Sequence, residues 1–157
     1  LSMKLLVLLC LLSVVLGASI SGKKAVGAKG TLVCGKAPAS NVRVRLFRVK
    51  PGKKDDIGQL IDEKYTGPQG MFHVEGNTNG FPLNETDLQP VISFYHHCDD
   101  DPKKLEKTAF RRFNYILPET FVNQGEKAKK TYDLGTLNIQ LEFPNEKREK
   151  TIVEKAA

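Results

Sequence analysis

Residues 41–47 read Asn-Val-Arg-Val-Arg-Leu-Phe, and this stretch indicates the class of fold. Its three aliphatic side chains, Val42, Val44 and Leu46, occupy every second position and so face one side of an extended chain. The residues between them face the other side. We therefore expect a β-strand whose alternate side chains point to opposite faces, and which ends at the turn-forming pair Pro51-Gly52.

Short segments with the same period recur from Val26 onward, and none keeps a helical period over three turns. Further strands are expected at 30–34, 59–66, 71–75, 91–98, 110–117 and 137–143. About seven or eight strands without crossover helices predict an all-β chain. The expected architecture is an immunoglobulin-like sandwich of two antiparallel sheets over residues 26–144.

Three connecting segments also carry local predictions. Residues 67–70, Gly-Pro-Gln-Gly, suit a tight turn with proline at its second position. Residues 83–89 have the composition of one short helical turn that Pro90 closes. Residues 145–157 are dense in Glu and Lys, so we expect a charged, flexible tail there.

The start of the chain has the pattern of a secretory signal peptide. Lys4 precedes an unbroken apolar run over residues 5–12, which continues at 14–16, and small residues follow at 17–19. The run is too short for a stable membrane span, so we expect residues 1–18 to be removed by cleavage after residue 18 or 19. The mature protein is then a secreted, extracellular single domain and not an integral membrane protein.

Export decides how the cysteines are interpreted. Cys10 leaves with the signal peptide, which leaves Cys34 and Cys98 in an oxidising compartment. Two such cysteines favour one disulfide, with unpaired thiols or an intermolecular link as the alternatives. Export also makes Asn84 a glycosylation candidate, because Asn84-Glu85-Thr86 is an N-glycosylation sequon in an expected surface loop.

The charge balance is moderately basic, with 24 Lys+Arg against 18 Asp+Glu and a net charge of +6. Such a surplus is compatible with anionic phospholipid or glycan partners, whereas the chain has no module typical of nucleic-acid binding. The residues that would form an anionic-surface patch are Arg43, Arg45, Lys103, Lys104, Lys107, Arg111 and Arg112. The alternative is a strand face that charge merely keeps soluble.

The stretch His96-His97-Cys98, followed by three aspartates at 99–101, has the residue types of a metal site. Its spacing is unfavourable, because neighbouring strand residues point to opposite faces. A disulfide at Cys98 would also remove the thiolate, and the EF-hand spacing for calcium is absent. We therefore expect no metal site and no cofactor.

Five stretches in one order resemble the nematode transthyretin-like family, secreted relatives of transthyretin. They are 30–34 (GTLVC), 41–47 (NVRVRLF), the turn 66–72, 92–98 (ISFYHHC) and 131–138 (TYDLGTLN). The resemblance implies a transthyretin-type sandwich, secretion, a Cys34–Cys98 disulfide and no shared enzymatic activity. The second cysteine pair of many family members is missing from 99–110 and 144–157, which implies a looser tail.

The transthyretin fold also has an enzyme branch, the hydroxyisourate hydrolases, which uses histidines, an arginine and a terminal Tyr-Arg-Gly-Ser. This chain has Met71 after Gly70, where those enzymes place the arginine, and it ends Glu154-Lys155-Ala156-Ala157. We therefore expect a non-enzymatic extracellular binding module that contacts an extracellular protein or an anionic cell surface. The alternative is a carrier of a small apolar ligand in a pocket or oligomer channel.

Overall fold

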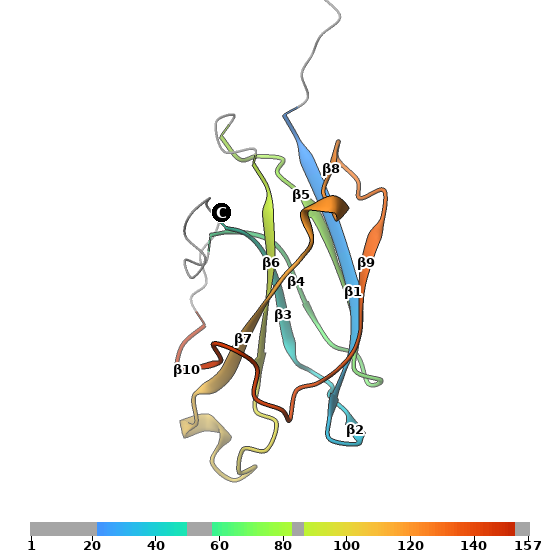
Figure 1. Ribbon diagram of the computed structural model, residues 1–157. Helices are drawn as coiled ribbons and strands as arrows, with labels where there is room; N and C mark the ends of the chain where they lie inside the picture. The colour runs from blue at the N-terminus through green and yellow to red at the C-terminus, as the bar shows by residue number, and fades with distance from the viewer. Residues whose placement is uncertain (1–21, 50–57, 83–86, 153–157) are drawn as a thin grey trace, which may run out of the picture.

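The computed structural model describes residues 22–49, 58–82 and 87–152 (Figure 1). The predicted signal peptide and the Asn84 sequon lie outside the described residues, so both stay predictions. Residues 83–86 of the predicted helical turn at 83–89 also lie outside the described residues. Of that segment, Leu88 is buried and Gln89 already begins a strand.

Within the described residues the chain forms two five-stranded sheets that face each other (Figure 1). Sheet A contains β1 (Lys24–Cys34), β2 (Ala37–Pro38), β5 (Met71–Asn77), β8 (Asn123–Gln124) and β9 (Thr131–Asn138). Sheet B has the order β10 (Lys147–Glu149), β7 (Phe110–Ile116), β6 (Gln89–His96), β3 (Arg43–Val49) and β4 (Gln59–Tyr65). Two short 3-10 turns, η3 (Leu105–Lys107) and η4 (Glu119–Phe121), lie on either side of β7 along the chain. The predicted all-β sandwich is confirmed.

The predicted alternation in β3 is confirmed on the side that faces the core, but the opposite side is buried as well, since Arg45 and Phe47 are each 2% exposed. Val44 and Leu46 are fully buried in the core between the sheets, and Val42 joins them just before the strand begins. Phe94 of β6 occupies the centre of this core, where its ring packs edge-on against Phe72 of β5. Burial of these apolar side chains is the main stabilising contribution to the sandwich.

The predicted turn at residues 67–70 is also confirmed. Gly70 N donates a hydrogen bond to Gly67 O at 2.9 Å, and Leu32 N donates to Gly70 O at 2.8 Å. Gly70 has a positive φ of 74°, and a Cβ at this position would lie 2.1 Å from Leu32 O. Only glycine fits here without displacing β1.

The predicted last strand at 137–143 is wrong. The strand is β9, which ends at Asn138, and the chain then turns away. Asn138 causes the turn, because its Oδ1 accepts hydrogen bonds from Gly35 N at 3.0 Å and Gln140 N at 3.1 Å. Beyond it Ile139 is 1% exposed and Leu141 is 62% exposed, so these alternate residues do not share a face.

Sheet A also departs from the expected antiparallel arrangement at one position. β9 pairs with β1 in parallel, from Gly27 opposite Thr131 to Val33 opposite Asn138, whereas the other described strand pairs are antiparallel. β1 begins at Lys24 rather than at Gly30 because it is central to the sheet. Hydrogen bonds to β5 on one side and to β8 and β9 on the other hold its small residues extended.

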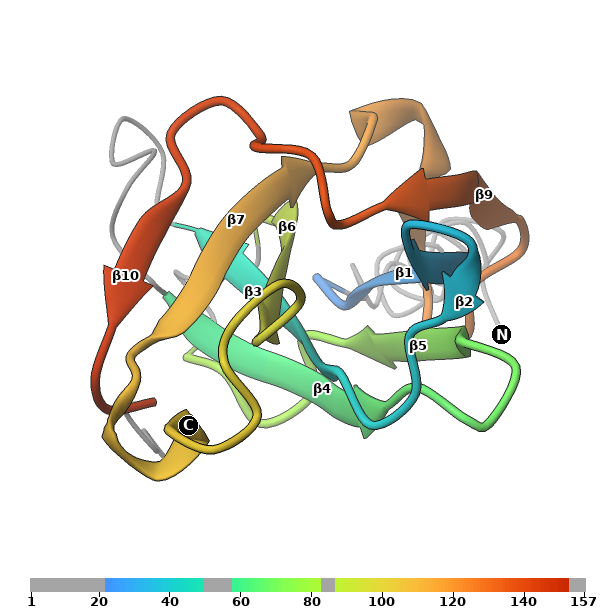
Figure 2. The same cartoon turned by 90° about the horizontal axis from the view of Figure 1, so that it is seen from below.

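The prediction of a flexible tail from residue 145 is wrong over the described part, which ends at residue 152. Residues 147–149 form β10, which pairs with residues 110–112 of β7. We call residues 139–149 the clasp, because this segment crosses from the end of β9 in sheet A to the edge of sheet B (Figure 2). Phe143 anchors it by stacking on Phe113, with ring centroids 4.0 Å apart.

Candidate functional site

The predicted basic patch includes two arginines on the face of β3 that points away from the core. Both interact with Glu63 of β4: Arg43 Nη2 lies 2.9 Å from Glu63 Oε2, and Arg45 Nε lies 2.8 Å from the same oxygen. Arg45 is only 2% exposed and also lies over the Phe47 ring, 5.0 Å from its centroid. These cations therefore stabilise the pairing of β3 with β4.

The two arginines predicted in β7 are buried as well. Arg112 Nε lies 2.8 Å from Glu149 Oε1 of β10. Arg111 donates to both Glu146 oxygens, at 2.5 and 3.1 Å, and to the carbonyl oxygens of Leu141 at 3.1 Å and Cys98 at 3.2 Å. The expectation that Arg45, Arg111 and Arg112 belong to an exposed basic patch is wrong, because all three side chains are buried and each forms an ion pair with a glutamate.

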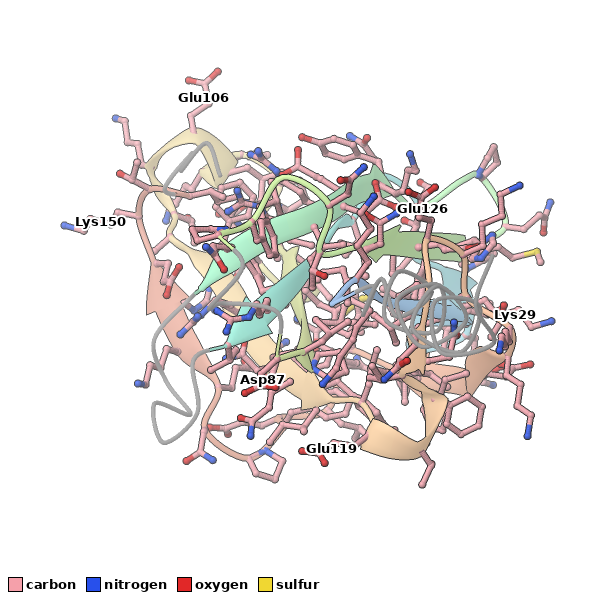
Figure 3. The ribbon with its side chains drawn as sticks, turned by 90° about the horizontal axis from the view of Figure 1, so that it is seen from above. Lys29, Asp87, Glu106, Glu119, Glu126 and Lys150 are labelled. Atoms are coloured by element: carbon pink, nitrogen blue, oxygen red, sulfur yellow. A yellow bond between two sulfur atoms is a disulfide. The ribbon has the colours of Figure 1, made fainter. Side chains whose placement is uncertain are left out.

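The predicted lysines do lie at the surface. Lys103, Lys104 and Lys107 are exposed on the connection between β6 and β7, which Asp101 shapes by accepting a hydrogen bond from Lys103 N at 3.0 Å. The exposed residues of this connection carry both signs of charge, and Glu106 extends outward from η3 (Figure 3). The connection is therefore an exposed loop of mixed charge and not a uniformly basic surface.

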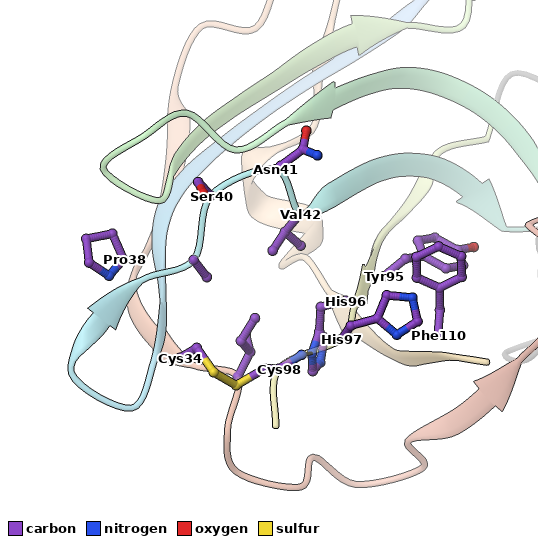
Figure 4. Close-up of a pocket in the computed structure, with 12 residues that line it drawn as sticks. Cys34, Pro38, Ser40, Asn41, Val42, Tyr95, His96, His97, Cys98 and Phe110 are labelled. Atoms are coloured by element: carbon purple, nitrogen blue, oxygen red, sulfur yellow. Dashed lines mark hydrogen bonds between the residues drawn. A yellow bond between two sulfur atoms is a disulfide. The ribbon is translucent and has the colours of Figure 1, made fainter. Parts of the chain in front are cut away.

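The Cys34–Cys98 disulfide is present in the structure, with its Cα atoms 5.8 Å apart. It joins the last residue of β1 in sheet A to a residue just beyond β6 in sheet B. It therefore links the two sheets directly. A pocket of about 320 Å³ lies beside it, between residues 38–42, the end of β6 and Phe110 (Figure 4).

His96 lies at this end of the sandwich and is 3% exposed. Its Nδ1 accepts a hydrogen bond from Cys98 N at 3.2 Å, and its ring lies edge-on to Phe113. Burial, followed by the nearby Arg111 charge, lowers the pKa of His96 to about 4. The imidazole is therefore neutral at physiological pH.

His97 points away from His96 and binds a different partner. Its Nδ1 lies 2.9 Å from Asp100 Oδ2, and its ring packs on Phe110 with centroids 4.3 Å apart. Arg148 donates two hydrogen bonds of 2.7 Å to the Asp100 carboxylate. These bonds, with that of Arg148 the largest effect, lower the pKa of Asp100 to about 2.

The arrangement is unsuitable for a metal ion. Among the described residues, Cys34, Cys98 and Asp99 offer possible ligand atoms that all lie within 4.8 Å of one another. Both sulfur atoms are bonded in the disulfide, so neither cysteine has the thiolate through which it would coordinate a metal, and Asp99 is left as the single ligand of this group.

A second hollow, which the sequence did not indicate, lies on the outward face of sheet A. It has a volume of about 390 Å³. We call its rim the open face, formed by the outward-pointing residues Lys29, Thr31, Met71, His73 and Asp133. Met71 is 62% exposed, and Lys29 projects outward from β1 (Figure 3). The period-two pattern around Met71 is the only sequence signal that points to this face.

The charges of the open face come from three adjacent strands. The residue Lys29 of β1 lies opposite His73 of β5 on one side and Asp133 of β9 on the other. His73 Nε2 lies 3.6 Å from Glu75 Oε2, and Asp133 Oδ1 accepts a hydrogen bond from Gly135 N at 2.8 Å. The open face therefore combines a large exposed apolar side chain with charges of both signs.

Across the described part of the chain, no helix is long and apolar enough to span a bilayer.

The two sheets and their connecting disulfide define a small β-sandwich protein of the transthyretin type. A model of the Transthyretin-like family matches residues 29–118. The relatives include Transthyretin-like protein 46 of Caenorhabditis elegans, which is 39% identical over 126 residues, covering 80% of this chain and 65% of that protein. Transthyretin-like protein 33 of the same organism is 32% identical over 134 residues, with coverage of 85% and 87%. The chain belongs to the Transthyretin-like family.

Transthyretin-like protein 5 of Caenorhabditis elegans is 30% identical over 147 residues and covers 94% of this chain and 98% of that protein. Among solved structures, a 9R-lipoxygenase from Cyanothece aligns with a TM-score of 0.41 and 16% identity, over 74% of this chain and 16% of that chain. A likeness of that size carries no argument about fold or function.

Proposed function

We propose that this protein is a secreted, non-enzymatic binding module that contacts an extracellular protein through the open face of sheet A. The observation that carries the proposal is the exposure of Met71 beside charges of both signs. An apolar anchor within a rim of mixed charge is typical of protein-binding surfaces. Membership in the Transthyretin-like family and the predicted signal peptide support export.

A protein partner suits this surface better than an anionic membrane or glycan. Lys29 would attract an anionic surface, but the carboxylates of Asp133 and Glu75 on the neighbouring strands would repel it. Arginines that would strengthen such attraction are buried in ion pairs on sheet B. A protein surface, in contrast, can present complementary charges of both signs.

Site-specific photo-crosslinking tests the proposal. A photoreactive amino acid replaces Met71 in one variant and Leu141 in the control; both native side chains are 62% exposed, but Leu141 lies in the clasp. Each variant is incubated with the extracellular fluid of its source and, separately, with vesicles that contain anionic lipid. We expect a protein adduct at position 71 and none at position 141. Equal labelling at both positions, or adducts with lipid alone, would contradict the proposed surface.

The companion variant Lys29→Glu reverses one charge of the open face and leaves the core intact. We expect it to reduce the adduct at position 71 about tenfold, in the range measured for charge pairs at protein interfaces. Lys64→Glu is the matched control, because Lys64 is an exposed lysine on β4 in sheet B. An equal reduction by both variants would indicate a general charge effect.

The second candidate function is a carrier of a small, largely apolar ligand. It is supported by the volume of the hollow, about 390 Å³, which falls within the usual range of ligand pockets, and by Phe72 and Met71 in its lining. Native mass spectrometry of the protein purified from its source separates the two candidates. A carrier retains a bound small molecule that Met71→Glu removes, whereas a protein-binding module is recovered without one.

A further inference from the structure

The clasp closes over the disulfide end of the sandwich, and Arg111 makes many of the contacts that hold it there. Its guanidinium group binds both oxygens of Glu146 and the carbonyl oxygen of Leu141, which are all clasp groups. The same guanidinium group donates to Cys98 O at 3.2 Å, and Cys98 lies just beyond β6 and outside the clasp. The position of the clasp therefore depends on the position of Arg111.

His96 binds the backbone N–H of the same residue, Cys98. Cys98 N donates to His96 Nδ1, while Cys98 O accepts from Arg111, so two neighbouring side chains fix one peptide segment. Because Nδ1 is the acceptor, the neutral ring carries its hydrogen on Nε2. A second proton can be added only at Nδ1, and there it must break the bond to Cys98 N.

Four charged groups act electrostatically on His96. They are Arg111 of β7, Glu146 of the clasp, Asp100 of the loop after β6 and Arg148 of β10. The two carboxylates favour a charged imidazole, but Arg111 already binds Glu146 and Arg148 already binds Asp100. Burial and the Arg111 charge outweigh the carboxylates, so the closed structure does not accommodate a charged His96.

We propose that the clasp is an acid-sensitive closure: a proton on His96 breaks its bond to Cys98, repels Arg111 and releases residues 139–149 from sheet B. Release uncovers the backbone of residues 110–112 of β7, which pair with β10 in the closed form. An uncovered strand edge can pair with an extended segment of another chain. This inference is independent of the open face and of the function proposed for it.

His96 sets most of the pH range of the effect. In the released form the exposed imidazole has its ordinary pKa near 6.5, against about 4 in the closed form. Protons then favour the released form between these values, and linkage gives a rise of about 30-fold in the opening equilibrium from pH 7.5 to pH 5. Asp100 stays ionised throughout this range, because its pKa is about 2.

Hydrogen exchange on the full chain tests the closure. Exchange of clasp amides is measured at pH 7.5 and pH 5, corrected for intrinsic rates and compared with peptides from β3 and β6. We expect the opening equilibrium of residues 139–149 to rise about 30-fold while β3 and β6 stay protected. A rise below threefold in the clasp, or the same rise throughout the sandwich, overturns the proposal.

Two variants identify the titrating group. His96→Asn keeps an acceptor near the position of Nδ1 but cannot take up a proton, so the rise should disappear. The control variant His73→Asn removes an exposed histidine of the open face. In this variant the rise in the opening equilibrium at pH 5 should remain. If His96→Asn fails to fold, the pH dependence of the unmodified protein still decides the outcome.

Discussion

Replacing Arg111 by methionine should destabilise this protein more than any surface charge change. Arg111 is buried, and its carboxylate partner Glu146 has a side chain that is only 9% exposed. The methionine keeps much of the side-chain volume but removes the Arg111 donor from a buried carboxylate and from three carbonyl oxygens, those of Cys98, Gln140 and Leu141. Breaking a buried ion pair on one side costs about 3–5 kcal/mol, so the free energy of unfolding should fall by about that amount.

Urea unfolding at pH 7 followed by circular dichroism measures this loss. In the double variant Arg111→Met/Glu146→Met no uncompensated charge remains, so at least half of the lost stability should return. Lys64→Met is the control, because Lys64 forms an exposed pair with Asp62 at 3.5 Å and should change the unfolding free energy little. A loss below about 1 kcal/mol for Arg111→Met, or no recovery in the double variant, would refute the role given to Arg111.

Four further perturbations test the fold. Reduction of the disulfide should lower the unfolding free energy in urea by about 4 kcal/mol, given its sequence separation of 64. Gly70→Ala should cost well over 2 kcal/mol by steric overlap, whereas Gly80→Ala should cost only about 1 kcal/mol because open space surrounds it. Ile139→Ala should cost about 2–4 kcal/mol and Leu141→Ala under about 0.5 kcal/mol; equal losses would contradict the turn after β9. The pKa of Asp100 lies below its ordinary value, so its contribution is present above pH 4 and is lost toward pH 2; acid titration of Asp100→Asn should lack this phase.

Sequence reasoning succeeded where one local pattern determines the structure. The alternation in residues 42–47 fixes which side chains of β3 enter the core between the sheets, because period two is a property of the extended chain itself. The Gly-Pro-Gln-Gly turn is similarly local, since proline and glycine restrict the backbone directly. The Cys34–Cys98 disulfide was predicted from the compartment, the cysteine number and the family resemblance, and not from a local pattern.

Sequence reasoning failed where the partner of a side chain lies far away in the sequence. Arg45 and Arg112 read as surface charges until Glu63 and Glu149 are placed on the adjacent strands. The alternation through 137–143 also predicted a continuous strand, because the sequence does not reveal that Asn138 turns the chain. The open face could not be located either, since it requires β1, β5 and β9 to lie side by side.

The clasp is a segment whose C-terminal part was predicted to be flexible but is ordered. Its last five residues, 145–149, belong to the segment 145–157, whose density in Glu and Lys is typical of a solvated tail. Its carboxylates Glu146 and Glu149 nevertheless find buried arginine partners in β7. A charged segment therefore becomes ordered when the sheet beside it supplies matching charges, which composition alone does not report.

The parallel pairing of β9 with β1 constrains the order in which this protein can be completed during its synthesis. β1 is made first and β9 near the end, so the last ladder of sheet A must wait for almost the whole chain. Contacts of such long sequence separation form late and slow the folding of β proteins. Cys98 emerges before β9 does, so the disulfide can tie the two sheets together while one side of β1 is still unpaired. Oxidation would then shorten the search by which β9 finds its place.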